Sequence, residues 1–378
     1  MEPVTLAVIL AAFVGGMVGL ASHQARGSRR FWARIADQRN LVFDPGGFFD
    51  SMEINGVIDD VTVKAHMVTR GNGNTHQVYT VVEARPNVPL PEGLQLTKEG
   101  IGTKIVKVLG GQDIPIANRL LDGKLRVRGD DPPAVQGVLD HPLAEPALEA
   151  VATGDAYTRF EKGSLIIEKS GHALNKLEDM IDTAVRGARG LDQAVRAPWL
   201  QLAEERGFRH EETPRSATLD GMLGGQSILI RAQHTEERAR TDITIHLDGG
   251  LPRGVRLRAG KGDRRLRDPI LDGRMVMEAT TRGTGPETEA ISWLKDRLAD
   301  EQHDLRGCLM DVLQGLPGAM IEDGVLSYSM DRRAGSDLPG LLDRLTALST
   351  ALSDPAPRPA DPEPSMAARP AAPRRQRG

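Results

Sequence analysis

An internal repeat constrains the fold of this chain more than any other feature. Residues 113–127 (DIPIANRLLDGKLRV) and residues 263–277 (DRRLRDPILDGRMVM) both begin with aspartate and reach Leu-Asp-Gly at the same spacing. Apolar residues recur in step, in the pairs Ile116/Leu266, Leu120/Ile270, Leu121/Leu271, Leu125/Met275 and Val127/Met277. We interpret the matching apolar residues, glycines and turn aspartates as determinants of one fold that occurs twice.

Further landmarks repeat in the same order along the chain. The matched segments are 32–41 with 199–208, 54–56 with 219–221, 90–96 with 251–257, and 162–165 with 323–326. A period this long indicates a duplicated domain and not a solenoid of short units. Each copy has roughly 150 residues, enough to close its own core.

The sequence therefore predicts an α+β protein with two tandem copies of one domain. Each copy is expected to contain an opening helix, an antiparallel sheet, covering helices and a closing helix. The expected segments are a transmembrane helix at 3–24, a basic juxtamembrane segment at 25–30, repeat domain 1 at 31–196, repeat domain 2 at 197–352, and a disordered tail rich in proline, alanine and arginine at 353–378.

The opening helix of each copy carries a tryptophan on its apolar face. Trp32, Ile35 and Ala36 have helical spacing, and the second copy repeats them as Trp199, Leu202 and Ala203. We expect both tryptophans to be core anchors, because large aromatic side chains dominate core burial.

Strands joined by short polar loops predict an antiparallel meander in each copy. The expected strands are 57–65 and 77–83, with counterparts at 226–232 and 241–247. Tight hairpins are expected at two places in each copy: 121–124 and 162–163, matched by 271–274 and 323–324. The closing helices are expected at 174–195 and 338–352, the first leading into Trp199 without a flexible linker.

The N-terminal stretch is long and apolar enough to span a bilayer. Residues 3–24 carry no charged side chain when His23 is neutral, and as a helix they measure roughly 30 Å. Arginines follow the stretch at positions 26, 29, 30 and 34, which favours a cytoplasmic location for the bulk of the chain. A cleaved signal peptide is the alternative, although the chain begins Met-Glu-Pro without a positive n-region.

Small residues recur at every fourth position of this stretch, at Ala7, Ala11, Gly15 and Gly19. Such a stripe allows close approach of a second helix, so it predicts self-association. The alternative is that small residues are simply common in membrane helices.

Composition limits the classes of partner. The formal net charge is −4 and aromatic residues make up 3% of the chain, which argues against nucleic-acid binding by base stacking. The single cysteine, Cys308, cannot form an intramolecular disulfide, and we expect a buried, inert thiol.

Several residue patterns suggest chemistry without establishing it. The pairs Asp113/Asp122 and Asp263/Asp272 could serve as acid and base, but Asp-Gly is mainly a turn signal. The histidine pairs His66/His76 and His234/His246 lack a third ligand, and residues 283–285 (GTG) lack the rest of a phosphate loop. We therefore expect no metal and no cofactor.

A cluster of cations in the second copy could contact an anionic lipid or a phosphorylated partner. It comprises Arg253, Arg256, Arg258, Lys261, Arg264, Arg265 and Arg267. A solvated strand face and loop is the simpler interpretation.

Two classes of function remain. The first is a membrane-anchored, non-enzymatic binding or scaffold protein, and the alternative is a membrane-anchored enzyme of hydrolase type. Duplicated catalysis would leave one polar set in both copies, or one intact set and one decayed set. The residues that match are fold determinants, so the sequence favours a binding or scaffold protein without naming its ligand.

Overall fold

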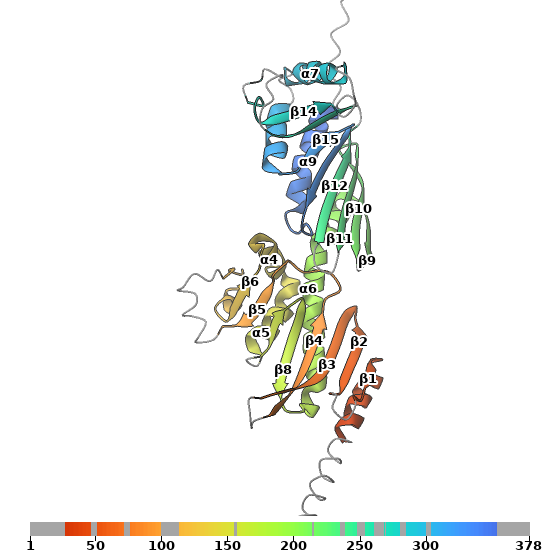
Figure 1. The fold of residues 1–378 in the computed structure, drawn as a ribbon, viewed down its shortest axis with the longest axis vertical. Coiled ribbons are helices and arrows are strands. Elements are labelled where there is room, and N and C mark those ends of the chain that lie inside the picture. Colours follow the sequence, from red (N-terminus) through yellow and green to blue (C-terminus); the bar gives the residue numbers. More distant parts are fainter. Residues whose placement is uncertain are drawn as a thin grey trace, which may run out of the picture.

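The computed structural model describes residues 27–46, 51–71, 76–99, 113–154, 157–213, 215–234, 239–247, 254–260, 268, 270–279, 285–299 and 304–353. It has an α+β fold with two eight-stranded antiparallel sheets. The two halves follow one another along the long axis of the molecule, with α6 between them (Figure 1). This arrangement is consistent with two tandem domains.

The two sheets have the same strand order. The first runs β1 (Val42–Asp44), β2 (Glu53–Ile58), β3 (Val61–Arg70), β4 (Gln77–Arg85), β8 (Ser164–Ser170), β7 (Arg159–Glu161), β5 (Gln95–Lys98), β6 (Leu125–Arg128). The second runs β9 (Arg209–Thr213), β10 (Ser216–Leu223), β11 (Gln226–His234), β12 (Ala239–His246), β16 (Val325–Met330), β15 (Met320–Glu322), β13 (Val255–Ala259), β14 (Met275–Ala279). Each strand of one half thus has a counterpart in the other at the same chain position, as the repeat predicts.

Helices cover one face of each sheet. The first half has an unlabelled helix at residues 27–38, then α3 (Arg119–Asp122), α4 (Pro132–Leu139) and α5 (Glu145–Thr153). The second half has α7 (Gly285–Leu298), α8 (Leu305–Leu309) and α9 (Leu338–Ser353). Single turns lie at η1 (Pro142–Ala144), η2 (Leu174–Lys176) and η3 (Met310–Gln314).

Helix α6 (Leu177–Arg206) joins the two halves. Its first part buries Leu177 and Ile181 in the first half, and its last part buries Trp199 in the second. Pro198 lies inside it and removes one helical hydrogen bond, yet the helix continues to Arg206. The closing helix of one half and the opening helix of the next are therefore continuous, which confirms that no flexible linker separates them.

The opening helices pack as the apolar pattern predicts. Trp32 and Trp199 both have no solvent-exposed surface. A core side chain two or three residues after each opening helix packs against a glycine of the next hairpin. A Cβ atom at Gly221 would lie 2.4 Å from Cδ1 of Phe208, and Gly56 stands in the same relation to Leu41, at 2.7 Å from Cδ2. The repeated glycines thus make room for core side chains.

Buried threonines recur at one further place in both halves. Thr80 and Thr241 have no exposed surface. Their hydroxyls donate to the carbonyl oxygens of Gly171 at 2.9 Å and Arg332 at 2.7 Å, respectively. Both bonds fix the chain just before the closing helix. The residues that follow the two accepting carbonyl groups, His172 and Arg333, therefore occupy equivalent positions in the two halves.

Tight hairpins form at some of the expected sites. Lys162 and Gly163, like Asp323 and Gly324, both have positive φ and connect adjacent strands with two-residue loops. The expected single strand at 57–65 is wrong: it is broken between β2 and β3 by a two-residue turn of aspartates with positive φ, a conformation that Asp tolerates.

The Leu-Asp-Gly segments do not form the expected two-residue hairpins. Asp122 ends the short helix α3, and Gly123 has a φ of −74°. In the second half only Gly273 of the Asp-Gly pair has positive φ. Leu120 and Ile270, which match between the repeats, are 82% and 42% exposed, so this pair does not contribute to a core as the sequence suggested.

In the part of the chain that the structure describes, no helix is long and apolar enough to cross a membrane. The segment 3–24 with its small-residue stripe, and the tail from residue 354 onward, lie outside the described residues.

Candidate functional site

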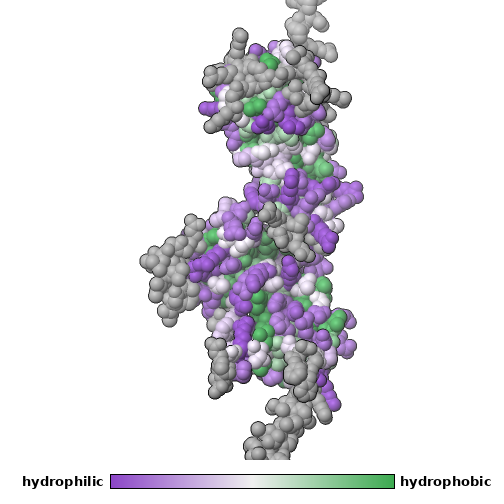
Figure 2. Space-filling model, viewed as in Figure 1, coloured by the Kyte–Doolittle hydropathy of each residue, from purple (hydrophilic) through white to green (hydrophobic). Residues whose placement is uncertain are grey.

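A cleft of about 1400 Å³ lies between the two halves. The first half contributes residues 85–95 and six residues between 130 and 138, with further contacts from Ala194, Val195 and Pro198 of α6. The second half contributes Arg215, His234 and residues 331–337. On the face shown in Figure 2, hydrophilic side chains are concentrated where the halves meet, and hydrophobic ones form small separate areas.

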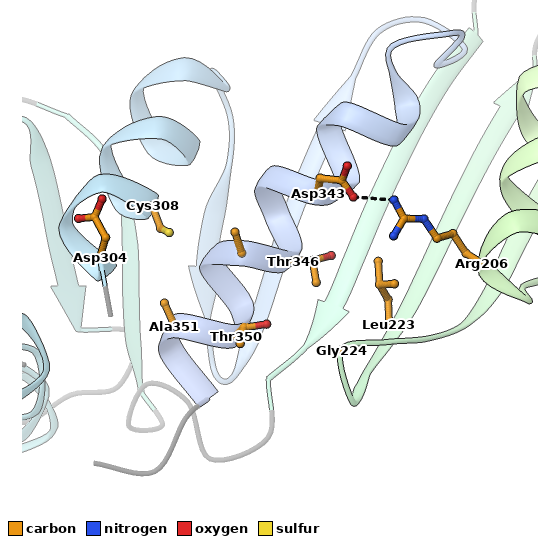
Figure 3. Close-up of a pocket in the computed structure, with 10 residues that line it drawn as sticks. Arg206, Leu223, Gly224, Asp304, Cys308, Asp343, Thr346, Thr350 and Ala351 are labelled. Carbon is orange, nitrogen blue, oxygen red and sulfur yellow. Dashed lines mark hydrogen bonds and ion pairs between the residues drawn. The ribbon is translucent and has the colours of Figure 1, made fainter. Parts of the chain in front are cut away.

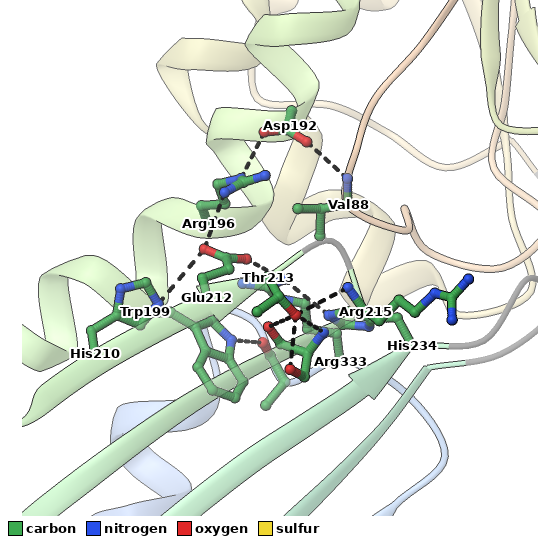
Figure 4. A network of polar contacts seen from close by, with 12 residues as sticks. Val88, Asp192, Arg196, Trp199, His210, Glu212, Thr213, Arg215, His234 and Arg333 are labelled. Atoms are coloured by element: carbon green, nitrogen blue, oxygen red, sulfur yellow. Dashed lines mark hydrogen bonds and ion pairs between the residues drawn. The ribbon is translucent and has the colours of Figure 1, made fainter. Parts of the chain in front are cut away.

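A chain of polar contacts crosses the junction beside this cleft (Figure 4). Asp192 of α6 accepts a hydrogen bond from the backbone N–H of Val88 at 2.8 Å and another from Nε of Arg196 at 2.7 Å. Arg196 also contacts Glu212 of β9 at 3.3 Å. These contacts connect the first half, α6 and the second sheet.

Arg333 forms the centre of the network in the second half. Its Nη1 donates to Glu212 at 2.9 Å, and its guanidinium carbon lies 5.1 Å above the ring of Trp199. The indole of Trp199 donates to the carbonyl oxygen of Ala334 at 2.8 Å. Arg333 is only 8% exposed, because the helix, the sheet and the loop before α9 all enclose it.

The buried charges shift the pKa values of their neighbours. Burial and the positive charge of Arg333 lower the pKa of His234 to about 4. Burial also lowers the pKa of His210, against the opposing effect of Glu212, and it lowers the pKa of Arg333 itself. Both histidines are therefore neutral at pH 7, and Glu212 is placed to balance the two arginines.

A second ion pair bridges the halves directly. Arg332 contacts Asp131 of the first half at 3.2 Å and Asp337 of the second at 2.5 Å. Asp131 also caps α4 by accepting from the N–H of Ala134, as its Asp-Pro sequence predicts. Arg332 lowers the pKa of Asp337 against the effect of burial.

The ionisable groups that the second half adds to the network, His210, Glu212, His234 and Arg333, have no like counterpart at the equivalent positions of the first half. The register of β1 against β2 and of β9 against β10 pairs Phe43 with Ile54 and His210 with Leu219, so Phe43 occupies the position of His210. By the same register and the matched hairpins, Pro45, Thr69 and His172 stand where the second half has Glu212, His234 and Arg333. The first half forms the same sheet without these groups, so the fold does not require them.

The structure locates only part of the predicted cationic cluster. Arg256 and Arg258 lie on β13, where they form ion pairs with Glu322 at 2.7 Å and Glu278 at 2.5 Å. The other five members, Arg253, Lys261, Arg264, Arg265 and Arg267, lie outside the described residues. Both described arginines are thus matched by carboxylates on neighbouring strands.

The two aspartates of the first copy hold backbone groups. Asp113 accepts from the N–H of Val127 at 2.7 Å, and Asp122 accepts from the N–H of Ile116 at 3.0 Å. In the second copy Asp268 stands at the position of Asn118 and accepts from two backbone N–H groups at the start of the matching turn. The backbone N–H of Asp272 donates to the carbonyl oxygen of Asp268 at 3.0 Å. Asp263 lies outside the described residues.

The remaining candidates do not converge. His234 pairs with Ala239, whereas His246 pairs with Ser227 at the other end of the hairpin. Within the described ranges, no three His, Cys, Asp or Glu side chains are grouped so that they could hold a metal ion.

A second hollow of about 530 Å³ lies between α8, α9 and the β10–β11 turn (Figure 3). Arg206 and Asp343 form an ion pair at its edge, at 2.8 Å. Cys308 lines it, and burial together with Asp304 and Asp311 raises the pKa of the thiol. A protonated, partly buried thiol is a poor nucleophile at neutral pH.

Sequence reasoning missed the network around Arg333, because its members are scattered from residue 192 to residue 333. The available signal was a difference between the repeats: ionisable residues of the second copy stand where the first has Phe43, Pro45 and Thr69. No family model, characterised protein or solved structure matches this chain.

Proposed function

We propose that this chain is a non-enzymatic binding protein whose ligand occupies the cleft between the two halves. The observation that carries the proposal is the restriction of the Arg333 network to one half. Buried apolar residues, glycines and Thr80/Thr241 occur in both halves because the fold needs them. The polar groups beside the large cleft occur in only one half, and the other half forms the same sheet without them. We therefore assign them a role other than folding that half.

The chemistry of the cleft supports binding over catalysis. A general acid or base works best with a pKa near the operating pH. The pKa of His234 is lowered to about 4, and that of Asp337 falls below its ordinary value. Both shifts move the pKa values of these groups further below pH 7. The carboxylates of Glu212 and Asp131 are engaged by arginines or by a helix cap.

The N-terminal stretch would place this cleft at a membrane. Residues 3–24 are uncharged, and arginines follow them, which supports a single-pass anchor with the cleft on the cytoplasmic side. The stripe of Ala7, Ala11, Gly15 and Gly19 supports pairing of two anchors. A pair would present two clefts to the same membrane-bound partner and gain by effective concentration.

Selection of displayed peptides tests the cleft on the full-length protein in lipid nanodiscs. Ala134 lines the cleft, so Ala134→Trp should fill part of it and abolish enrichment of the peptides that the wild type selects. Leu200→Trp is the matched control, since Leu200 is half-exposed on α6 and does not line the cleft. Equal enrichment by the wild type and Ala134→Trp would overturn the proposal.

A further inference from the structure

Three nitrogen atoms at the cleft have unmet hydrogen-bonding capacity. Nε and Nη2 of Arg333 and Nδ1 of His234 are buried, and none has a hydrogen-bond partner among the described residues. Both side chains line the cleft. A buried donor without an acceptor costs about 1–3 kcal/mol, so these atoms mark a place where an acceptor from outside the described chain would bind favourably.

All three nitrogens are donors. A guanidinium group has no acceptor. Nε2 of His234 lies 3.3 Å from Nη1 of Arg333, so Nε2 must accept from it. The lowered pKa keeps the imidazole neutral at pH 7, which places its one proton on Nδ1. The group that satisfies this set must therefore offer only acceptors.

The geometry of the guanidinium selects the kind of acceptor. Nη1 is directed to Glu212, which leaves the Nε–Nη2 edge, where two parallel N–H bonds match the two oxygens of a carboxylate. The guanidinium carbon lies 5.1 Å from the centroid of the Trp199 ring, and this cation–π contact restrains the side chain. Burial strengthens such a pair because water does not compete for the donors.

The charge of the cleft favours a single negative charge. The described residues that line it include five acidic ones (Glu92, Asp130, Asp131, Asp331, Asp337) and five basic ones (Arg85, Lys162, Arg215, Arg332, Arg333). A balanced lining opposes the single negative charge of a carboxylate less than the two charges of a phosphate dianion. Apolar side chains also line the cleft, among them Val88, Phe160, Val195 and Pro198.

We infer that the cleft binds a monocarboxylate attached to an apolar body, with the carboxylate on the Nε–Nη2 edge of Arg333 and on Nδ1 of His234. The inference rests on the proposed function and specifies its ligand class. The C-terminus of a peptide that ends in an apolar residue has this chemistry, and so does a free aliphatic acid.

Affinity capture on immobilised full-length protein in nanodiscs tests the inference and separates these sources. One arm offers a hexapeptide library with free C-terminal carboxylates and apolar last residues, and a second offers the same library as C-terminal amides. A third arm measures octanoate by equilibrium dialysis. We expect retention of the acid library or of octanoate, and at least about tenfold weaker retention of the amides, as for loss of a charge-assisted hydrogen-bonded pair.

Variants assign the effect to Arg333. Arg333→Lys keeps a positive charge for Glu212 but cannot present two parallel donors, so it should weaken capture about 10- to 100-fold. Arg209→Lys makes the same change at an exposed arginine of β9 that does not line the cleft and should leave capture unchanged. Circular dichroism and melting temperature establish that both variants are folded.

The outcomes distinguish the two proposals. Equal capture of acids and amides, or unchanged capture by folded Arg333→Lys, would overturn the carboxylate inference while leaving binding in the cleft intact. Failure of Ala134→Trp to reduce any capture would overturn the proposed function itself.

Discussion

Acidification should destabilise this protein through His234. The side chain is 7% exposed, and its pKa is lowered from 6.5 to about 4 in the folded protein. The unfolded chain therefore binds a proton at His234 at a higher pH than the folded chain does. The stabilisation associated with the neutral imidazole is complete above pH 6.5 and is lost as the pH falls towards 4.

The magnitude follows from the size of the shift. A difference of about 2.5 pH units at about 1.4 kcal/mol per unit gives a maximum loss of about 3 kcal/mol. About 2 kcal/mol of this should be lost by pH 5. His210 and His66 also have lowered pKa values, so the total acid destabilisation exceeds the contribution of His234.

The His234→Gln variant isolates that contribution. Glutamine offers Arg333 an uncharged acceptor and does not titrate. The difference in unfolding free energy between the wild type and the variant, from urea titrations at pH 7, 6, 5 and 4, should change by about 3 kcal/mol over this range. NMR titration of ¹³C-labelled histidines measures the pKa directly. A pKa near 6.5 for His234, or a pH-independent difference between the two proteins, would refute the reasoning.

Three further predictions concern the repeat and the anchor. Gly221→Ala should lower the unfolding free energy by about 1–3 kcal/mol through overpacking, whereas Gly123→Ala, where a Cβ meets no atom within 4 Å, should change it little; equal effects in denaturant titrations would contradict the packing argument. The Asp122→Asn/Asp272→Asn double variant should keep its melting temperature within a few degrees, because an Asn side-chain oxygen can still accept from a backbone N–H; a folded double variant that lost all function in cells would show that these carboxylates act in chemistry. Full-length protein should resist alkaline extraction from membranes, whereas a variant lacking residues 1–27 should not. The reason is that residues 3–24 carry no charged side chain and can span a bilayer. A mature N-terminus near Ser22 would instead establish a cleaved signal peptide.

The sequence by itself determined the duplication and the core positions that specify it. Trp32 and Trp199 are buried alike, and the same strand order occurs in both sheets. Packing between neighbouring elements of one domain requires apolar residues at regular spacing and glycines at close approaches. Both requirements can be recognised in the sequence. The continuous α6 was also foreseeable, since no turn signal precedes Trp199 except a single proline.

The local sequence pattern was insufficient to predict the conformation where the same residues are compatible with two conformations. Asp-Gly in residues 121–124 fits both a two-residue hairpin and the end of a short helix, and backbone bonds to Asp122 select the helix. Asp59 and Asp60 lie in an apolar, β-branched segment that predicts a strand, but they also tolerate positive φ, and in the structure they form the turn between β2 and β3.

Only the tertiary structure determined the cleft and its polar network. Asp192, Arg196, Glu212, His234 and Arg333 come from α6, two strands and a loop. Apart from the i,i+4 spacing of Asp192 and Arg196 on α6, no spacing in the sequence relates them. Their proximity depends on how the second half docks against the end of α6. The buried environment that shifts their pKa values exists only after that docking, because desolvation is a property of the packed structure and not of the chain.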